Sequence, residues 1–354
     1  MKSDVYLVKV SSSDPNQRQA ALKRIIQAKD FCANFKKEEI VPVKLTIGDT
    51  PCVYNVSPEL VKIIIQEISR HQAKPFLFDT CVIYQGERQN AVDHLTLAEK
   101  KGFSYAKIGV PFIIADGLFG QDGREFVVDR EDLKKIRVPS FVGMLDSLVV
   151  LTHVTGHIVS GYAGAIKNVA MGMSCRATKQ MQHSSLKPSV LIEKCTKCGC
   201  CMAICPAKAI TFKNEKKAFI DQSLCVGCAE CLCACKFDAI KINWEEEPKI
   251  FCERMVAVAG AILNRFKNKF FINFALDITK ECDCISKKGE KIVSEDFGIL
   301  ASNDIVSLDQ ASMDLALEHK KTNFLAGVKE LHQDTIDYAV QRGMGNKEYN
   351  LIEL

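Results

Sequence analysis

Residues 195–206 read Cys195-x-x-Cys198-x-x-Cys201-x-x-x-Cys205-Pro206, and residues 225–235 read Cys225-x-x-Cys228-x-x-Cys231-x-x-x-Cys235. The two runs share one spacing and therefore form an internal repeat. Three cysteines placed three residues apart can wrap one face of an iron–sulfur cubane through a tight turn, and the chain after the third cysteine leads away into a short helix. The fourth thiolate of each cluster is therefore expected to come from the other run.

Two [4Fe–4S] clusters are the cofactors that this repeat predicts, because it has the spacing of the bacterial two-cluster ferredoxins. The first cluster is predicted to be held by Cys195, Cys198, Cys201 and Cys235. The second is predicted to be held by Cys225, Cys228, Cys231 and Cys205. Zinc sites pair two short Cys-x-x-Cys units and do not repeat a four-cysteine run. A disulfide framework needs an oxidising compartment, of which the sequence carries no sign.

The composition is that of a globular protein with room for two or three domains. The chain has 354 residues, of which 47% are hydrophobic and 25% charged. Its net charge of +4 is too small, and its basic residues are too dispersed, to predict a nucleic-acid partner. The first ten residues do not resemble a secretory signal, and the apolar segment 141–160 is interrupted by polar residues, so no membrane insertion is predicted. We therefore expect a cytoplasmic protein, and the oxygen sensitivity of ferredoxin-type clusters suggests an anaerobic source.

Strand-like and helix-like segments alternate outside the cysteine repeat. Apolar strand patterns lie at residues 5–10, 40–47, 75–80, 110–115, 125–128, 144–153 and 270–278, and helical spacing lies at residues 17–33, 57–71 and 90–101. Residues 212–221, between the two cysteine runs, alternate like a β-hairpin. This alternation predicts an α/β domain with a mostly parallel sheet. The pattern resumes after the repeat, so a ferredoxin-like α+β module is predicted to be inserted into one domain. The expected boundaries are 1–188 for the first part of the α/β domain, 189–244 for the module and 245–354 for the second part.

The glycine-rich segment after the strand at 144–153 is the first candidate binding site. It runs from Gly156 to Asn168 and contains His157, Gly161, Gly164 and Lys167. Glycines let a backbone approach a ligand closely, and the N–H groups at a helix start attract anions. We predict catalytic roles for His157 and Lys167 and cofactor contacts for Gly161, Gly164 and Asn168. The alternative is a structural turn with a solvated lysine.

Polar residues also follow the expected strands, at positions where parallel sheets bind ligands. They are Asp49, Asp79, Asp116 and His153, and each aspartate could equally cap a helix or form a turn. A further candidate is Cys282-Asp283-Cys284, whose two sulfurs could meet one soft metal in a turn. The alternatives for this pair are a functional thiol without metal and inert packing.

Three groups of residues carry a resemblance to a known family. They are Gly156-His157 to Gly161 with Gly164 and Lys167-Asn168; Asp277-Ile278-Thr279 with Cys282-Asp283-Cys284; and Asp296-x-Gly298-Ile299-Leu300-Ala301-Ser302-x-Asp304 with Asp309-x-x-x-x-Asp314-Leu315. On these motifs the chain resembles the uncharacterised iron–sulfur centre proteins, the family named domain of unknown function 362. The resemblance covers nearly the whole chain, with the ferredoxin insert in its usual place. It implies an α/β domain with clusters and no known reaction.

The leading functional hypothesis is an iron–sulfur redox protein. Its two clusters would pass electrons to or from a site in the α/β domain, built around the 157–168 and 282–284 motifs, with a redox protein as partner and a small molecule as substrate. One alternative is a maturation or carrier protein that binds or delivers metal. Another is a ferredoxin-type electron carrier whose α/β domain only docks partners. The sequence contains no flavin or nicotinamide motif that would distinguish an oxidoreductase from the two alternatives.

Overall fold

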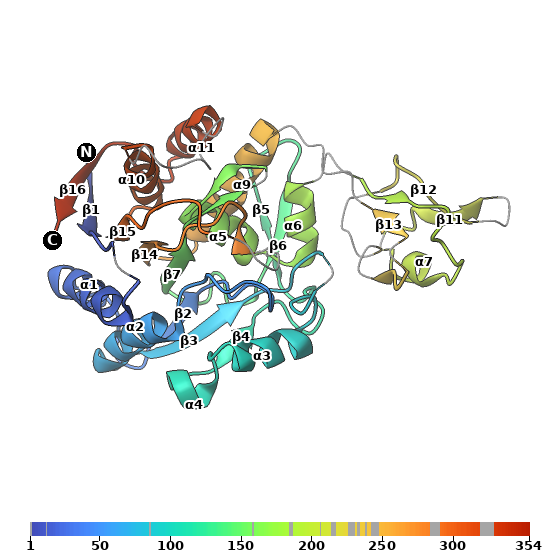
Figure 1. Ribbon diagram of the computed structural model, residues 1–354. Helices are drawn as coiled ribbons and strands as arrows, with labels where there is room; N and C mark the ends of the chain where they lie inside the picture. The colour runs from blue at the N-terminus through green and yellow to red at the C-terminus, as the bar shows by residue number, and fades with distance from the viewer. Residues whose placement is uncertain are drawn as a thin grey trace.

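The computed structural model describes residues 2–354 except 12, 85, 158, 184–186, 206, 214–216, 226–230, 232–233, 238, 242–247, 284–290 and 319–328. A mixed α/β domain and a smaller lobe make up the described chain (Figure 1). Two of the predicted ligands, Cys228 and Cys284, lie outside the described residues. None of the helices within the described ranges has the length and hydropathy that a membrane span requires.

A largely parallel sheet of eight described strands forms the centre of the α/β domain (Figure 1). In spatial order its strands are β16 (Tyr349–Glu353), β1 (Ser3–Val8), β15 (Gly298–Ser302), β14 (Asn268–Ala275), β7 (Ser147–His153), β2 (Ile40–Lys44), β3 (Lys74–Asp79) and β4 (Phe112–Ile114). Only β15 runs antiparallel to its neighbours among these strands. The predicted parallel α/β sheet is therefore confirmed, whereas β15 and β16 had not been recognised in the sequence.

Helices cover both faces of this sheet. One face is covered by α1 (Pro15–Ala28), α2 (Pro58–Arg70), α3 (Ala91–Lys100) and α4 (Tyr105–Ile108), and the other by α5 (Ala165–Gly172), α9 (Pro248–Leu263), α10 (Ile305–Glu318) and α11 (Lys329–Gln341). Strand β7 shows how the layers separate: Leu148 and Val150 join one core cluster and Val149 and Leu151 the other. Side chains of a strand alternate between the two faces, so a strand buried on both faces is continuously apolar.

Local sequence explains the main helix starts. Asp14 caps α1, Ser57 caps α2 and Asn90 caps α3, each with its side chain accepting a hydrogen bond from a backbone N–H of the first turn. A proline follows the cap in α1 and α2, where its missing N–H costs nothing. Three smaller elements complete the domain: the hairpins β5 (Arg124–Val127) with β6 (Lys135–Val138) and β8 (Thr155–His157) with β9 (Gly161–Ala163), and α6 (Arg176–Gln182).

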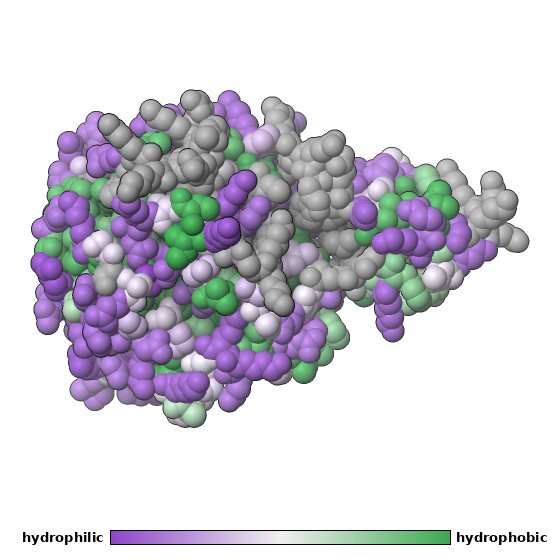
Figure 2. Space-filling model, viewed as in Figure 1, coloured by the Kyte–Doolittle hydropathy of each residue, from purple (hydrophilic) through white to green (hydrophobic). Residues whose placement is uncertain are grey.

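The cysteine-rich segment forms a lobe that projects to one side of the α/β domain (Figures 1 and 2). Its elements are β10 (Ser189–Val190), α7 (Cys200–Ile204), β11 (Ile210–Lys213), β12 (Lys217–Ile220) and β13 (Ile240–Lys241). Strands β11 and β12 pair as the antiparallel hairpin that the sequence predicted between the two cysteine runs. Apolar side chains such as Ile192, Leu224 and Phe237 are exposed on this lobe.

Candidate functional site

A cavity of about 700 Å³ lies beyond the carboxyl ends of β2, β3 and β7. Asp49, Asp79 and His153, which follow or end those strands, all line it. Asp116 does not, because its buried carboxylate accepts hydrogen bonds from the N–H of Cys81. Parallel α/β sheets bind ligands at this edge, and the volume falls in the range of organic-ligand sites.

Asp79 stands at the centre of one end of the cavity, which we call the Asp79 end. Its Oδ1 lies 3.1 Å from Nζ of Lys44, a fully buried lysine at the last position of β2. Burial lowers the pKa of Lys44 to about 8, although Asp79 opposes the shift. Burial alone would raise the pKa of Asp79, but Lys44, His94 and Arg88 together hold it below its ordinary value. Asp79 is therefore an anion at neutral pH.

The side chain of Lys44 is closely packed and hydrogen-bonded. Its Nζ donates to the carbonyl of Leu45 at 2.6 Å and to Oδ1 of Asn168 at 2.9 Å. A Cβ atom on Gly172 would lie 2.4 Å from Cε of this lysine, so a larger residue at that position of α5 would displace the lysine. Burying a lysine is costly unless it is paired and hydrogen-bonded, and here both conditions are met.

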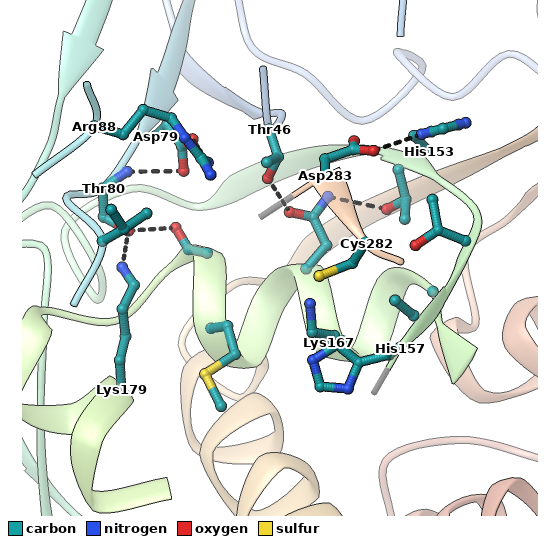
Figure 3. Close-up of a pocket in the computed structure, with 18 of the residues that line it drawn as sticks. Thr46, Asp79, Thr80, Arg88, His153, His157, Lys167, Lys179, Cys282 and Asp283 are labelled. Carbon is teal, nitrogen blue, oxygen red and sulfur yellow. Dashed lines mark hydrogen bonds and ion pairs between the residues drawn. The ribbon is translucent and has the colours of Figure 1, made fainter. Parts of the chain in front are cut away.

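Arg88 and Lys179 complete the Asp79 end (Figure 3). Arg88 donates from Nη2 to the hydroxyl of Tyr84 at 2.6 Å and from Nε to Asp49 at 3.3 Å. Lys179, from α6, donates to Oγ1 of Thr80 at 2.5 Å and to the carbonyl of Ser174 at 2.8 Å. Oδ2 of Asp79 is buried and accepts no hydrogen bond within the described residues, although it lies 3.9 Å from Arg88 and 3.6 Å from His94.

The opposite end of the cavity, which we call the Lys167 end, contains a buried ion pair. Nδ1 of His153 lies 2.8 Å from Oδ1 of Asp283, and Nε2 lies 2.8 Å from the carbonyl of Leu276. Both ring nitrogens face acceptors, so both carry protons. Burial lowers the pKa of His153, but Asp283 and the carbonyl outweigh that effect and raise the pKa above its ordinary value. His153 is the cationic partner of Asp283.

His157 has the opposite protonation. Its Nδ1 accepts hydrogen bonds from the N–H groups of Val159 at 3.3 Å and Ser160 at 2.9 Å, which leaves the proton on Nε2. Burial, with Lys167 and His183 nearby, holds the pKa of His157 well below its ordinary value. Burial and the nearby Lys167 therefore disfavour a proton on Nδ1 near neutral pH. The neutral ring is a fixed hydrogen-bond donor.

Lys167 lies beside His157 on the cavity wall (Figure 3). Burial lowers its pKa to about 8, while Asp283 opposes the shift. Asn168, the next residue, also lines the cavity but is engaged on both sides. Its amide donates to the carbonyl of Leu151 at 2.9 Å, and its oxygen accepts from Lys44. Asn168 thus fastens α5 to the ends of β7 and β2.

The two predicted glycines differ in position. Gly164 lines the cavity, and a Cβ there would lie 2.4 Å from Oδ1 of Asp309. Gly161 has a φ of +70° in the turn between β8 and β9 and is not among the lining residues. The N–H groups of Ala165 and Ile166 donate to Asp309 at 2.8 and 2.9 Å. An aspartate from α10 therefore occupies the start of α5, where we had expected an anionic ligand.

Cys282 and Asp283 reach the Lys167 end from the loop after β14. Cys282 is buried and disulfide-bonded. A metal held by its sulfur requires the reduced thiolate, and the other half of the predicted pair, Cys284, lies outside the described residues. Metal binding at this loop stays a prediction.

A second, smaller cavity lies in the lobe. Its walls include Cys195, Cys198, Cys201 and Cys235, the four residues predicted to hold the first cluster. Cys235 comes from the second cysteine run and the other three come from the first. Within the described part of the chain, no group of three or more His, Cys, Asp or Glu side chains is already arranged as a metal site.

Residues on both sides of the lobe in the sequence line the larger cavity. His183, at the end of α6, and Pro248, the first residue of α9, line that cavity. Phe251 of α9 lies between two histidine rings, with ring centroids 4.5 Å from His183 and 5.8 Å from His157. Phe251 thus stacks against two histidines of the cavity wall.

Comparison with known proteins identifies the family. The model described as "Domain of unknown function (DUF362)" matches residues 41–314, which include the cavity and the lobe. The chain belongs to this family. No curated protein matches the chain.

Two solved structures are among those similar to the DUF362 chain. A protein from Thermotoga maritima is 11% identical, with a TM-score of 0.48 over 94% of this chain and 60% of its own. The lactate racemase apoprotein from Thermoanaerobacterium thermosaccharolyticum is 12% identical, with a TM-score of 0.47 over 89% of this chain and 57% of its own. The chain thus covers about three-fifths of the length of each. Its function has to be inferred from its own residues.

Several aspartates in the family motifs hold the fold together. Asp309 of α10 accepts a hydrogen bond from the first residue of α5, and Asp304 accepts hydrogen bonds from the first turn of α10. Asp277 and Asp296 both pair with Arg18, at 2.5 and 2.7 Å. These motif residues lie away from the cavity wall, and their contacts show how they fix the strands and helices around it.

Sequence reasoning missed Lys44, Arg88 and Lys179. Lys44 ends an apolar strand, so its place at the ligand-binding edge could have been found by the rule that located Asp79. Arg88 and Lys179 follow no recognisable motif in the sequence. Only the tertiary structure brings them to Asp79.

Proposed function

We propose that this DUF362 protein is an iron–sulfur redox protein. Two [4Fe–4S] clusters bound by the lobe would relay electrons to or from a small molecule held in the 700 Å³ cavity of the α/β domain. The observation that carries the proposal is the lobe cavity, whose walls include three cysteines of the first run and the last cysteine of the second. That set matches the crossed ligation inferred from the spacing.

The chemistry of the lobe fits such clusters. Thiolates are the ligands of [4Fe–4S] clusters, and hydrogen bonds to their sulfurs tune the reduction potential. Sγ of Cys205 accepts the N–H of Ala209 at 3.3 Å, and Sγ of Cys235 accepts the N–H of Ala239 at the same distance. The fourth cysteine of each run therefore has an equivalent N–H partner. Cys195, Cys198, Cys201 and Cys235 would hold one cluster, and Cys225, Cys228, Cys231 and Cys205 the other.

The lobe core also favours a bound metal. Its described apolar cluster has nine buried residues, four of which are the cysteines Cys195, Cys201, Cys231 and Cys235. A module as short as residues 189–244 has little hydrocarbon core, and such small domains are often held together by a metal or by cross-links. Metal–thiolate bonds supply folding free energy in such domains.

The position of the residues that flank the lobe supports electron transfer between the lobe and the cavity. His183 and Pro248, which flank the lobe in the sequence, line the cavity. Phe251 stacks between His183 and His157. When bound, the clusters would supply one-electron chemistry, while the chain's own residues bind and orient the molecule: Lys167 and Arg88 by charge, and His157 as a neutral donor.

Anaerobic reconstitution of the full-length protein with iron and sulfide tests the proposal. We expect about eight iron atoms per chain from two [4Fe–4S] clusters, with EPR signals on reduction. Cys198→Ser should lose about half of the iron. Cys200→Ser is the matched control, because Cys200 lies in the same run but is not among the residues lining the lobe cavity. Zinc in place of iron, or equal iron loss in both variants, would overturn the proposal.

A second assay separates the redox protein from its alternatives. If reduced protein loses its electrons on addition of a small molecule, and that loss depends on Lys167, the redox role is supported. Transfer of iron to an apo-protein without such turnover would instead identify a metal carrier.

A further inference from the structure

We propose that the α/β cavity binds an organic acid that lies along α5, with its acidic group at Lys167 and His157 and a hydroxyl or amino group at Asp79. This inference deepens the proposed function by naming the ligand class. It rests on that function only for the redox change of the ligand, because binding itself needs no cluster. Figure 3 shows the two ends of the cavity separated along α5.

The charges on the wall favour an anion. Each lining carboxylate has a cationic neighbour within the described residues: Asp49 has Arg88, Asp79 has Lys44, and Asp283 has His153. Lys167 and Lys179 line the cavity as further cations. The wall therefore carries a net positive charge, and an anionic ligand would balance it.

The Lys167 end supplies two different donors to an acidic group. Lys167 offers an ammonium group. His157 offers Nε2–H, because its Nδ1 already accepts the N–H of Ser160 at 2.9 Å. A carboxylate has acceptor sites for both donors, and charge-assisted hydrogen bonds of this kind are roughly twice as strong as neutral ones. The neutral histidine adds direction without adding a second charge that would repel Lys167.

The Asp79 end supplies an acceptor. Asp79 lines the cavity with its side chain only 4% exposed, and its buried Oδ2 accepts no hydrogen bond from any described residue. A buried acceptor without a donor is costly, so a hydroxyl or ammonium group of a ligand would be stabilised there. A second acidic group would be repelled by the same oxygen. The two ends therefore recognise different groups, and this fixes the direction in which the ligand binds.

Much of the rest of the cavity lining is apolar. It includes Val82, Leu151 and Met171, the last of which belongs to α5. An aliphatic chain between the two polar groups would bury its methylene groups against these side chains. The volume of about 700 Å³ exceeds what a two- or three-carbon acid fills, which favours a longer chain.

The test measures binding of ω-hydroxy acids with four to eight carbons to the full-length protein by calorimetry. Each acid is compared with its amide, which lacks the charge, and with the acid that lacks the hydroxyl group. We expect one chain length to bind with a Kd below about 1 mM, and at least tenfold weaker binding by its amide and by the acid without the hydroxyl.

Three variants assign the two ends. Lys167→Met should weaken the best acid at least tenfold, and Lys167→Arg should restore binding to within about threefold. Lys62→Met, on the exposed face of α2, is the control and should bind as the parent does. Asp79→Asn should make the hydroxylated and unsubstituted acids bind alike, a change in selectivity that loss of stability would not produce. Binding that ignores the charge of the ligand, or that survives Lys167→Met, would overturn the inference.

Failure here can be distinguished from failure of the proposed function. Iron content and EPR signals are measured on the same samples before titration. Two clusters without acid binding would overturn the ligand class alone. Acid binding in protein that takes up no iron would support the ligand class and overturn the redox role.

Discussion

The α/β domain and the lobe position their functional groups in different ways. In the α/β domain, two large apolar clusters on either side of the sheet hold the strand ends in place. That support allows Lys44 and Asp79 to remain buried as an ion pair 3.1 Å apart. In the lobe, the described core has nine buried residues and four of them are cysteines. The residues expected to bind the cofactor are there part of the core itself.

The two regions should therefore respond differently to loss of their ligands. A site built on a hydrocarbon core exists before the ligand arrives, because packing and hydrogen bonds define it. A site whose ligands are also the core depends on the metal for its stability.

Removal of iron should have the largest effect, and it should be confined to the lobe. Chelation of reconstituted protein is expected to increase amide hydrogen exchange in β11 and β12 by about a hundredfold or more, because metal–thiolate bonds supply much of the folding free energy. Exchange in β2, β3 and β7 should stay within experimental error. Exchange that rises equally in both regions would show that the two regions do not differ in this way.

Gly172→Ala should damage the α/β site while leaving the lobe intact. The new Cβ would lie 2.4 Å from Cε of Lys44 and displace a buried charge from Asp79, at a cost of about 3 kcal/mol in the free energy of unfolding. Denaturant unfolding measures the change, and iron content should not fall. Gly260→Ala is the matched control, because its Cβ would meet only the flexible Met344 side chain at 3.3 Å.

Asp309→Asn should have a smaller effect on the same domain. The carboxylate accepts hydrogen bonds from Ala165, Ile166 and Asn273, and an amide can present a donor where an acceptor is needed. We expect a loss of about 1–2 kcal/mol in the free energy of unfolding, with binding of the organic acid and iron content unchanged. Asp337→Asn, at a partly exposed position of α11, serves as the control. A loss of acid binding without loss of stability would assign Asp309 to the ligand instead.

The pH dependence of Lys167 is the most local test. Its pKa of about 8 reflects burial together with Arg88 and Lys44, opposed by Asp283, with neutral His157 beside it. Only the neutral amine reacts with acylating reagents, so reactivity should be low below pH 8 and rise to half its maximum near pH 8. Peptide-resolved labelling measures this, with Lys167→Met as the blank. A midpoint near the ordinary value of 10.5 would show that the ammonium group is not buried as described.

The sequence predicted the sheet because its signals are local. Apolar runs, the cap at Ser57 and turn residues are each recognised within a few neighbouring residues. Strands β15 and β16 were missed because the first is a short apolar run among turn residues and the second lies in a mixed polar tail. Their pairing with β1 depends on contacts between the two ends of the chain.

The site was predicted less completely than the fold, for a similar reason. His157 and Lys167 were found because a glycine-rich motif marks them, and both line the cavity. The protonation of His157 could not be predicted, since it depends on the N–H of Ser160 and on burial. Arg88 and Lys179 come from separate loops and helices, and no spacing in the sequence associates them with Asp79.

EPR of two variants tests the crossed ligation of the lobe. Cys198→Ser and Cys205→Ser alter the same cysteine run, but crossed ligation assigns Cys198 to the first cluster and Cys205 to the second. Each reconstituted variant should keep about four iron atoms, and the signal that survives in one should be the signal that is lost in the other. Loss of the same signal from both variants would contradict crossed ligation.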